Sequence, residues 1–504
     1  MTRTKKSIKN IKYALVGQVS ALLITFVSRT VFVKILGEEY LGVNSLFTNI
    51  LTMLSFAELG IGAAITYSLY SPLANNETEQ IKSIMLLFKK VYKYIGVIIL
   101  ILSVLLIPFL DNIAKDGYDV NGVYLIYFLF VINSVVSYFY NYKRSLIIAD
   151  QNRYIATIYR YAFFNITSII QIALLIVFKN YILFLIIQVV MTILENILIS
   201  KKADQMYPYL KDNNVKKLDK VTLSEIIKNT KAMFGHKIGG IIVNSTDNLL
   251  ISKISGIATV GLYSNYLLIV GSLNTVFSIL FQSVMSSIGN LGVSSSYEKK
   301  NEIFNIVNLV CFVIYGFTSV LLLLFLNPFI KLWIGEKFLL ENSVLWIIII
   351  NFYITGMRKS VLTFRDALGL FWHDRFKPIF EVLFNLTFSI ILGLKFGIFG
   401  ILLGTTLSTL FVCCWVEPYI LFKYGLKSEL KKYFLIYFYQ IFVLLIIITI
   451  SINLISLNFV PNFYLFDLLI KFLLISIICF GGIIISHIKT SEIRKLFKIL
   501  IKGS

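Results

Sequence analysis

Runs of apolar residues, each long enough to cross a membrane, recur along the whole chain and constrain its fold more than any other feature. A helix needs about 20 residues to cross the hydrocarbon core of a bilayer. The runs lie approximately at 13–34, 41–68, 92–110, 122–142, 154–178, 181–200, 232–252, 257–285, 303–326, 339–357, 378–394, 397–421, 433–456 and 464–487. Only 14% of the 504 residues are charged, against about 25% in soluble domains. The sequence therefore predicts an all-α integral membrane protein with about 14 transmembrane helices.

Lysine and arginine fall unevenly in the segments between these runs. Of the 47 such residues, 36 lie in the two termini and every second loop, seven in the other loops and four within the runs. An imbalance of this kind marks the cytoplasmic side of a membrane protein. We therefore expect both termini to be cytoplasmic, and the net charge of +21 needs no nucleic-acid partner to explain it.

Residue patterns typical of metal, disulfide and nucleotide sites are missing from the sequence. The four cysteines fall in apolar runs, the three histidines lie far apart, and no Gly-x-x-x-x-Gly-Lys-Ser/Thr loop occurs. Cysteines in such runs behave as small buried apolar residues, and isolated histidines do not form a zinc site. We expect no metal and no cofactor. Without a nucleotide-binding loop, transport would depend on a proton or sodium gradient, the membrane potential or an external energy source.

Two parts of the chain align with each other at an offset of 218 residues. Arg29 then matches Asp247, and one extra residue in the following loop brings Gly42 onto Gly261. Both copies would enter the membrane from the cytoplasmic side, so the repeats are parallel and related by an axis along the membrane normal. We expect two six-helix lobes at 1–200 and 232–421, a basic cytoplasmic linker at 201–231, and helices 13 and 14 with a basic cytoplasmic tail at 422–504.

Polar side chains form stripes on several predicted helices, which indicates faces that meet protein or water rather than lipid. Predicted helices 1, 2, 7 and 8 look like cavity walls, whereas 433–456 is almost entirely apolar. The candidate residues for substrate binding in this cavity are Arg29, Arg160, Lys237, Gln18, Asn44, Asn244, Asn274 and Gln282. The candidate gating or coupling residues are Glu58 and Asp247.

Simpler interpretations remain open for these residues. Small polar side chains also pack helices together, and a long cationic side chain such as Arg29 could extend to the membrane interface. Glu58 is harder to explain in this way, because it lies about 12 Å inside its predicted helix at 1.5 Å per residue. A charge there costs about 2.5–3.5 kcal/mol. The repeat suggests Arg29 with Asp247 as an outer gate and Glu58 with Lys237 as an inner gate.

Several short segments resemble bacterial flippases for polysaccharide repeat units, and the resemblance runs from about residue 8 to 430. These flippases form the polysaccharide transporter family of the multidrug/oligosaccharidyl-lipid/polysaccharide exporter superfamily. The segments are Ala57-Glu58-Leu59-Gly60-Ile61-Gly62, Tyr67–Leu73, Lys143-Arg144-Ser145-Leu146, His236-Lys237-Ile238-Gly239-Gly240, Gly261–Tyr266 and Trp415-Val416-Glu417-Pro418-Tyr419.

The resemblance implies a fold, a cargo and a location. The fold would be two six-helix lobes around a central cavity that opens alternately to either side of the bacterial plasma membrane. The cargo would be an oligosaccharide on undecaprenyl diphosphate, flipped to the outer leaflet for O-antigen, capsule or exopolysaccharide assembly. Partners would be the lipid-linked oligosaccharide, membrane lipids and assembly proteins such as a polymerase. Lipid II flippases of the superfamily bind diphosphate through cavity arginines, and Arg29 is the equivalent implied here.

Three other functions remain in consideration. A cation-coupled multidrug exporter of the same superfamily would need acidic residues in the cavity, whereas predicted helix 1 carries Arg29. A membrane enzyme acting on lipid-linked sugars would need a long outer loop, and the longest outer loop here is about 327–338. A scaffold of polysaccharide synthesis would not explain the polar helix faces. We therefore expect a transporter and not an enzyme.

Overall fold

Helices make up all the regular secondary structure that the computed structural model describes. The described residues are 3–495 except 59–60, 111–121, 151, 213–214, 216–217, 219–221, 225, 228–229, 231–244, 295, 371–372 and 458–463. The side chains of residues 3–11, 15, 56–57, 63–64, 67, 74, 282–287 and 289–294 also lie outside the description. The described chain packs as two compact units, Met1–Ser264 and Asn265–Ser504.

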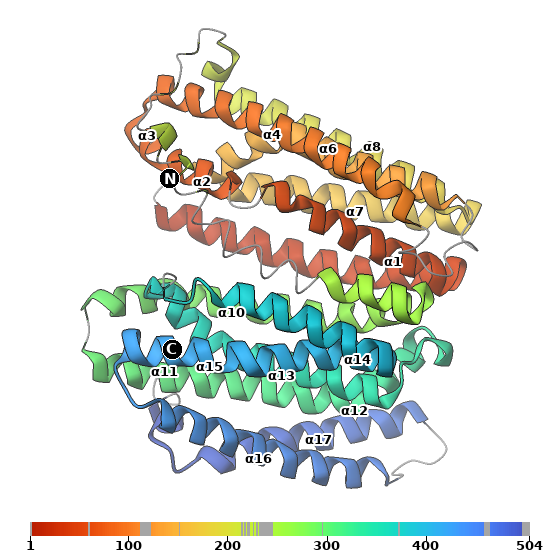
Figure 1. Cartoon of the computed structure of the whole chain (residues 1–504), viewed down its shortest axis with the longest axis vertical. Coiled ribbons are helices and arrows are strands. Elements are labelled where there is room, and N and C mark those ends of the chain that lie inside the picture. The colour runs from red at the N-terminus through yellow and green to blue at the C-terminus, as the bar shows by residue number, and fades with distance from the viewer. Residues whose placement is uncertain are drawn as a thin grey trace. The chain divides into compact units, whose positions relative to one another are not determined.

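Unit 1 contains four long helices that follow a longer first one. Its elements are α1 (Arg3–Leu54), η1 (Ser55–Glu58), α2 (Ile61–Ser68), α3 (Tyr70–Asn75), α4 (Thr78–Leu106), η2 (Ile107–Phe109), α6 (Val123–Ala149), α7 (Arg153–Phe178), α8 (Tyr181–Met206), η4 (Pro208–Lys211) and the first residues of α10 (Ile257–Ser294). Residues 245–255 are also helical. Helix α6 packs between α4 and α8, and α1 packs along α7 (Figure 1).

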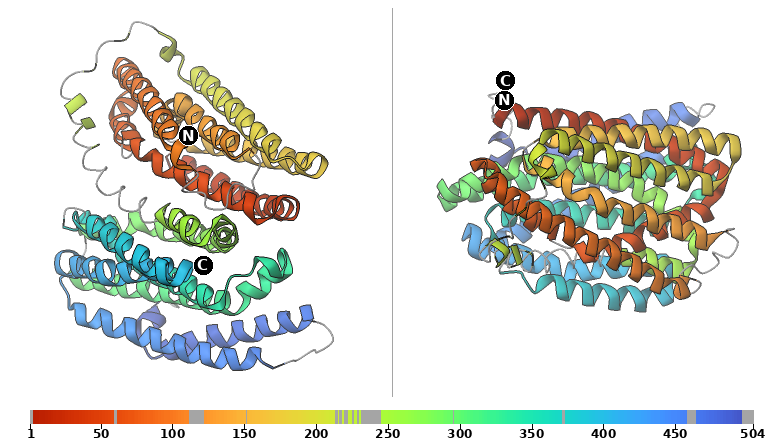
Figure 2. Two further views of the ribbon diagram at one scale, coloured as in Figure 1. Left: turned by 45° about the vertical axis from the view of Figure 1, so that its right-hand side comes forward. Right: turned by 90° about the horizontal axis from the view of Figure 1, so that it is seen from above.

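Unit 2 continues from α10 and contains the remaining helices. They are α11 (Tyr297–Cys311), η5 (Phe312–Gly316), α12 (Phe317–Trp333), η6 (Glu336–Phe338), α13 (Asn342–Ala367), α14 (Lys377–Ser408), η8 (Thr409–Cys413), α15 (Cys414–Ile420), η9 (Leu421–Leu426), α16 (Leu430–Ile455) and α17 (Tyr464–His487). Helix α13 packs against α11, α12 and α14, while α16 and α17 lie side by side and α17 also packs on α12 (Figure 2).

The predicted all-α membrane fold is confirmed. Within the described residues, eleven helices are long and apolar enough to cross a membrane. Two of these stretches each hold two predicted spans, because backbone angles at Gly37 (φ 86°) in α1 and Gly397 (φ 59°) in α14 are not helical. Only glycine adopts such positive φ angles readily. The predicted span 232–252 lies mostly outside the described residues.

Three predicted helix boundaries differ most from the structure, and the first is the start of the span predicted at 92–110, where α4 already begins at Thr78. The span predicted at 41–68 is broken, since α1 ends at Leu54 and a short 3₁₀ turn, η1, follows before α2. The helix predicted at 339–357 continues to Ala367 as α13. The residue after the predicted end is Arg358, whose guanidinium pairs with the Glu417 carboxylate (2.7 Å) inside unit 2, so the helix can continue past this charge.

Helix α1 and the start of α10 cross at two glycines, where their backbones nearly touch. A methyl group on Gly42 would lie 2.1 Å from the carbonyl oxygen of Ile257, and one on Gly261 would lie 2.2 Å from that of Glu38. The offset that relates Gly42 to Gly261 also relates Glu38 to Ile257. The contact is therefore reciprocal.

The predicted linker begins on the surface of unit 1. Helix α8 extends to Met206, and the residues after it are held by the side chains of Asp150, directly after α6, and Lys82 of α4. Tyr207 donates a hydrogen bond to Asp150 (2.8 Å), and the Lys82 ammonium lies 2.8 Å from the Asp212 carboxylate. Burial, and after it the bond to Asp150, raise the pKa of the Tyr207 phenol, so it stays a donor. The division into lobes at 1–200 and 232–421 stays a prediction.

Candidate functional site

A polar pocket of about 250 Å³ lies inside unit 1, between α1, α6, α7 and α8. Its polar lining consists of Thr25, Ser28, Arg29, Asn44, Thr48, Ser168, Gln171 and Gln188. Its apolar lining consists of Phe32, Leu41, Phe130, Phe164 and Phe184. Among the described residues, the lining contains one cation and no carboxylate, so the pocket suits an anionic or hydroxyl-rich ligand.

The turn between α7 and α8 positions one wall of this pocket. Helix α7 ends with Lys179 in the left-handed conformation (φ 51°), and the Asn180 side chain then accepts hydrogen bonds from the amides of Ile182 (2.8 Å) and Leu183 (3.2 Å). Asparagine favours this capping role because its side chain satisfies otherwise unpaired amides. The cap fixes Tyr181, the first residue of α8, beside Asn44 of α1.

Arg29 is the one charged residue among the described residues that line the pocket, and it is half-buried. Its Nη1 donates a hydrogen bond to the Ser264 hydroxyl (3.2 Å), and no ion pair joins it to any described residue. A guanidinium in a low-dielectric site without a counter-charge is costly. An anionic ligand would supply that charge.

Neutral hydrogen-bonding groups surround Arg29. The Tyr181 hydroxyl donates to Asn44 Oδ1 (3.0 Å), and Gln171 Nε2 donates to the Phe184 carbonyl (3.0 Å). Each bond fixes the orientation of an amide. The structure therefore brings Arg29 and Asn44, two of the predicted substrate-binding residues, into one pocket.

The other predicted cavity residues lie elsewhere. Gln18 accepts a hydrogen bond from the Tyr161 hydroxyl (2.7 Å), and Arg160 is exposed, with its guanidinium 5.9 Å from the Tyr161 ring. Asn274 belongs to unit 2, where its Oδ1 is buried and accepts no hydrogen bond from a described residue. Lys237 and Asn244, as well as the Gln282 side chain, lie outside the described residues.

The two predicted gating carboxylates have separate surroundings. Glu58 ends η1 at the break in the second span, where it accepts hydrogen bonds from the Tyr92 and Tyr138 hydroxyls. Asp247 is buried (9% exposed) and interacts electrostatically with Tyr263, the neighbour of the Ser264 that bonds Arg29. Both gate pairs stay predictions.

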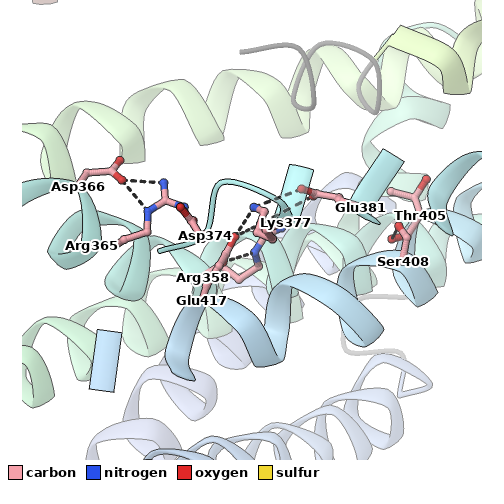
Figure 3. A network of polar contacts seen from close by, with 9 residues as sticks. All are labelled: Arg358, Arg365, Asp366, Asp374, Lys377, Glu381, Thr405, Ser408 and Glu417. Atoms are coloured by element: carbon pink, nitrogen blue, oxygen red, sulfur yellow. Dashed lines mark hydrogen bonds and ion pairs between the residues drawn. The ribbon is translucent and has the colours of Figure 1, made fainter. Parts of the chain in front are cut away.

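A buried charge network in unit 2 was missed by the sequence analysis. Glu417 of α15 is fully buried, and Arg358 of α13 holds it through two bonds, Nε to Oε2 (2.9 Å) and Nη2 to Oε1 (2.7 Å). Lys377 of α14 donates to the same Oε1 (2.6 Å) and pairs with Glu381 (3.2 Å). Figure 3 shows Glu417 between the two cations. Arg358 and Lys377 fall in the predicted loop between the spans at 339–357 and 378–394, so the sequence analysis did not connect them with Glu417. An acidic residue inside a span was itself a signal that a cation lies nearby.

The helix that carries Glu417 is irregular on both sides. The π-helical segments η8 and η9 flank the seven residues of α15, which also contain Pro418. Insertions of this kind are rare and concentrate at functional sites. The network therefore links three helices at a place where one of them departs from α-helical hydrogen bonding.

An apolar groove of about 590 Å³ lies in unit 2 between α12, α13, α16 and the segment from α14 to α15. Its lining includes Trp346, Ile350, Leu410, Trp415, Phe438 and Ile441. Two hydroxyls at its wall, those of Ser319 and Tyr353, are buried and unbonded within the described chain. The groove suits a hydrocarbon chain. Among the described residues, no three His, Cys, Asp or Glu side chains are placed to hold a metal ion.

Comparison with solved structures places the fold among membrane transporters. The chain resembles the lipid II flippase MurJ in an inward closed conformation, with a TM-score of 0.63 and 15% identity over 96% of this chain and all of that one. It resembles an inward-facing multidrug resistance MATE transporter of the MOP superfamily, with a TM-score of 0.60 and 14% identity over 82% of this chain and 98% of the other.

A MATE transporter of Vibrio cholerae is similar as well, with a TM-score of 0.57 and 14% identity over 85% of this chain and 99% of the other. No protein-family model and no curated protein matches the chain. The chain thus has the fold of MOP-superfamily transporters and is a multi-pass membrane protein.

Proposed function

We propose that this protein is an alternating-access flippase. It moves an oligosaccharide carried on undecaprenyl diphosphate from the inner to the outer leaflet of a bacterial plasma membrane, for surface polysaccharide assembly. The observation that carries the proposal is the Arg29 pocket, where one guanidinium lacks a carboxylate partner among the described residues. A diphosphate would pair with it through charge-assisted hydrogen bonds.

The remaining lining matches the rest of such a substrate. Asn44, Gln171 and Gln188 offer amides, and four Ser and Thr side chains offer hydroxyls, for hydrogen bonds to sugars. At about 250 Å³ the pocket is too small for a whole oligosaccharide, so it would hold the charged group and the nearest sugar only. The apolar groove of unit 2 is a separate surface that suits a hydrocarbon chain such as an isoprenoid.

A cation-coupled multidrug exporter is the second candidate, and the fold supports it equally, since MATE transporters share it. The pocket itself favours the flippase. A cationic drug would need a carboxylate in the lining, and a positive Arg29 would repel it.

Ligand binding distinguishes the two candidates. The thermal stability of the purified protein would be measured with undecaprenyl-diphosphate oligosaccharide, with the same lipid lacking its sugar, and with lipophilic drug cations. Ligands that bind the folded state raise its unfolding temperature. We expect both diphosphate lipids to stabilise the wild type. Arg29→Gln should weaken their binding about tenfold or more, because it removes a charge-assisted hydrogen bond.

The matched control is Arg153→Gln, which removes an exposed arginine at the start of α7. It should bind the diphosphate lipids as the wild type does. Stabilisation by drug cations but not by diphosphate lipids would support the exporter instead. No stabilisation by any of these ligands would leave the scaffold function as the better explanation.

A further inference from the structure

A second pocket of unit 2, of about 320 Å³, opens where α14 begins. It is polar at one end and apolar at the other. The polar end is formed by His373, Asp374 and Lys377, and the apolar wall includes Phe380, Phe384 and Phe411. The polar residues lie in the turn before α14 and at its first residue, whereas Phe380 and Phe384 lie farther along this helix. The polar end of the pocket therefore lies at the start of a helix long enough to cross a membrane.

One buried oxygen at the polar end lacks a donor. The Asp374 side chain is only 3% exposed, and its Oδ2 accepts a hydrogen bond from Arg365. Its Oδ1 is buried and accepts no hydrogen bond from any described residue. Leaving a buried acceptor unsatisfied costs about 1–3 kcal/mol, more when it is charged. A ligand with an N–H group would satisfy it.

The ammonium of Lys377 can bind an acceptor at the same end. It donates to Glu417 (2.6 Å) and pairs with Glu381 (3.2 Å). An ammonium has three donors, so one remains for an acceptor such as a phosphate oxygen. The pocket thus offers both an acceptor and a donor.

The surrounding charge favours a ligand without net charge. Figure 3 shows Arg358, Arg365 and Lys377 against the carboxylates of Asp366, Asp374, Glu381 and Glu417. Arg375, whose guanidinium lies 4.8 Å from the ring of the lining residue Phe376, adds a further cation, so the positive and negative charges balance. A balanced site favours a head group that pairs an ammonium with a phosphate over a purely anionic one.

The apolar wall faces outward from unit 2. Phe380, Phe384 and Phe411 are 53%, 41% and 62% exposed, although they lie in a helix long enough to cross a membrane. Phe380 and Phe384 are one turn apart on one side of α14, and from Lys377 to Phe384 the helix rises by about 10 Å. Acyl chains would lie against this wall.

We propose that this pocket binds one glycerophospholipid with a phosphoethanolamine head group. The ammonium donates to Asp374 Oδ1, the phosphate accepts from Lys377, and the acyl chains lie along the three phenylalanines. This lipid site is separate from the Arg29 pocket and holds whether or not the protein is a flippase.

Native mass spectrometry of the purified full-length protein tests the site. The protein would be mixed with phosphatidylethanolamine, its mono- and dimethyl derivatives, phosphatidylcholine and phosphatidylglycerol, all with the same acyl chains. Each methyl group removes an N–H donor without changing the charge. We expect the amount of lipid that stays bound to fall with methylation. For phosphatidylcholine it should be about one fifth of the amount for phosphatidylethanolamine, which corresponds to the loss of about one hydrogen bond. Phosphatidylglycerol should bind more weakly than phosphatidylethanolamine.

The Asp374→Asn variant tests whether the preference for phosphatidylethanolamine arises at this pocket. Because Arg365 holds Oδ2, the new amide would turn its oxygen to Arg365 and its NH₂ donor into the pocket, so the preference for phosphatidylethanolamine should disappear. Asp366→Asn changes a carboxylate that contacts the same Arg365 outside the pocket lining, and the preference should remain. Equal retention of phosphatidylcholine and phosphatidylethanolamine by the wild type, or a preference for phosphatidylglycerol, would overturn the proposal even if Asp374→Asn does not fold.

Discussion

At the scale of single residues, the spacing of α1 and α10 depends on two positions without side chains. A Cβ atom at Gly42 or Gly261 would collide with a backbone carbonyl, which unlike a side chain cannot turn away. We expect Gly42→Ala and Gly261→Ala each to lower the free energy of unfolding by about 1–3 kcal/mol, as overpacking does.

The control for this prediction is Gly271→Ala on the same α10, because nothing lies within 4 Å of a methyl group there. It should leave the unfolding temperature of the purified protein unchanged or slightly higher. If all three alanine variants unfold at the same temperature, the close crossing is wrong.

At the scale of elements, the charge network joins α13, α14 and α15 through one carboxylate. Glu417→Gln would leave Arg358 and Lys377 with too little negative charge, and breaking a buried ion pair in this way costs about 3–5 kcal/mol. Removing both charges in Arg358→Met/Glu417→Leu should recover part of that loss, because apolar pairs can replace buried ion pairs.

Thermal unfolding of the three variants measures the network. Lys331→Met is the control, since Lys331 pairs with Glu336 on the surface and such pairs contribute about 0–1 kcal/mol. An unfolding temperature for Glu417→Gln close to that of Lys331→Met would show that the network stabilises nothing.

The groove of unit 2 is also an element-scale feature, because four helical segments form it. Ile441 of α16 lines it, whereas the adjacent Phe442 does not and is 61% exposed. If the groove takes an isoprenoid chain, Ile441→Trp should fill it and slow the transfer of lipid-linked oligosaccharide between leaflets, while Phe442→Trp should have no effect. Equal rates for the two variants would argue against the groove as a substrate path.

At the scale of the whole molecule, much of the fold could be predicted from the sequence, because each span must satisfy its own backbone hydrogen bonds in lipid. Arg29 and Asn44 could be assigned to one site for a similar reason, since polar side chains avoid lipid. The network around Glu417 could not, because its partners are 40 and 59 residues away in the chain. An apolar run ends at a charged residue in the sequence, whereas the helix continues when a distant residue neutralises that charge.

The arrangement across the membrane is a further whole-molecule prediction. The imbalance of lysine and arginine predicts that Lys299 is cytoplasmic and Lys337 extracytoplasmic, and both side chains are exposed. A single cysteine at Lys337 should react with an impermeant thiol reagent in intact cells, and one at Lys299 only after permeabilisation. Native Cys311, Cys413 and Cys479 are buried and would react little. The reverse labelling pattern would show that the predicted topology is inverted.

The most direct test of the central claim is lipid transfer in proteoliposomes that contain the purified protein. A labelled undecaprenyl-diphosphate oligosaccharide starts in one leaflet, and a membrane-impermeant reagent detects its arrival in the other, with and without a proton or sodium gradient. We expect transfer that requires the protein, falls about tenfold or more in Arg29→Gln and persists in Arg153→Gln. No protein-dependent transfer of several such lipids under either gradient, or equal transfer by Arg29→Gln, would contradict the account.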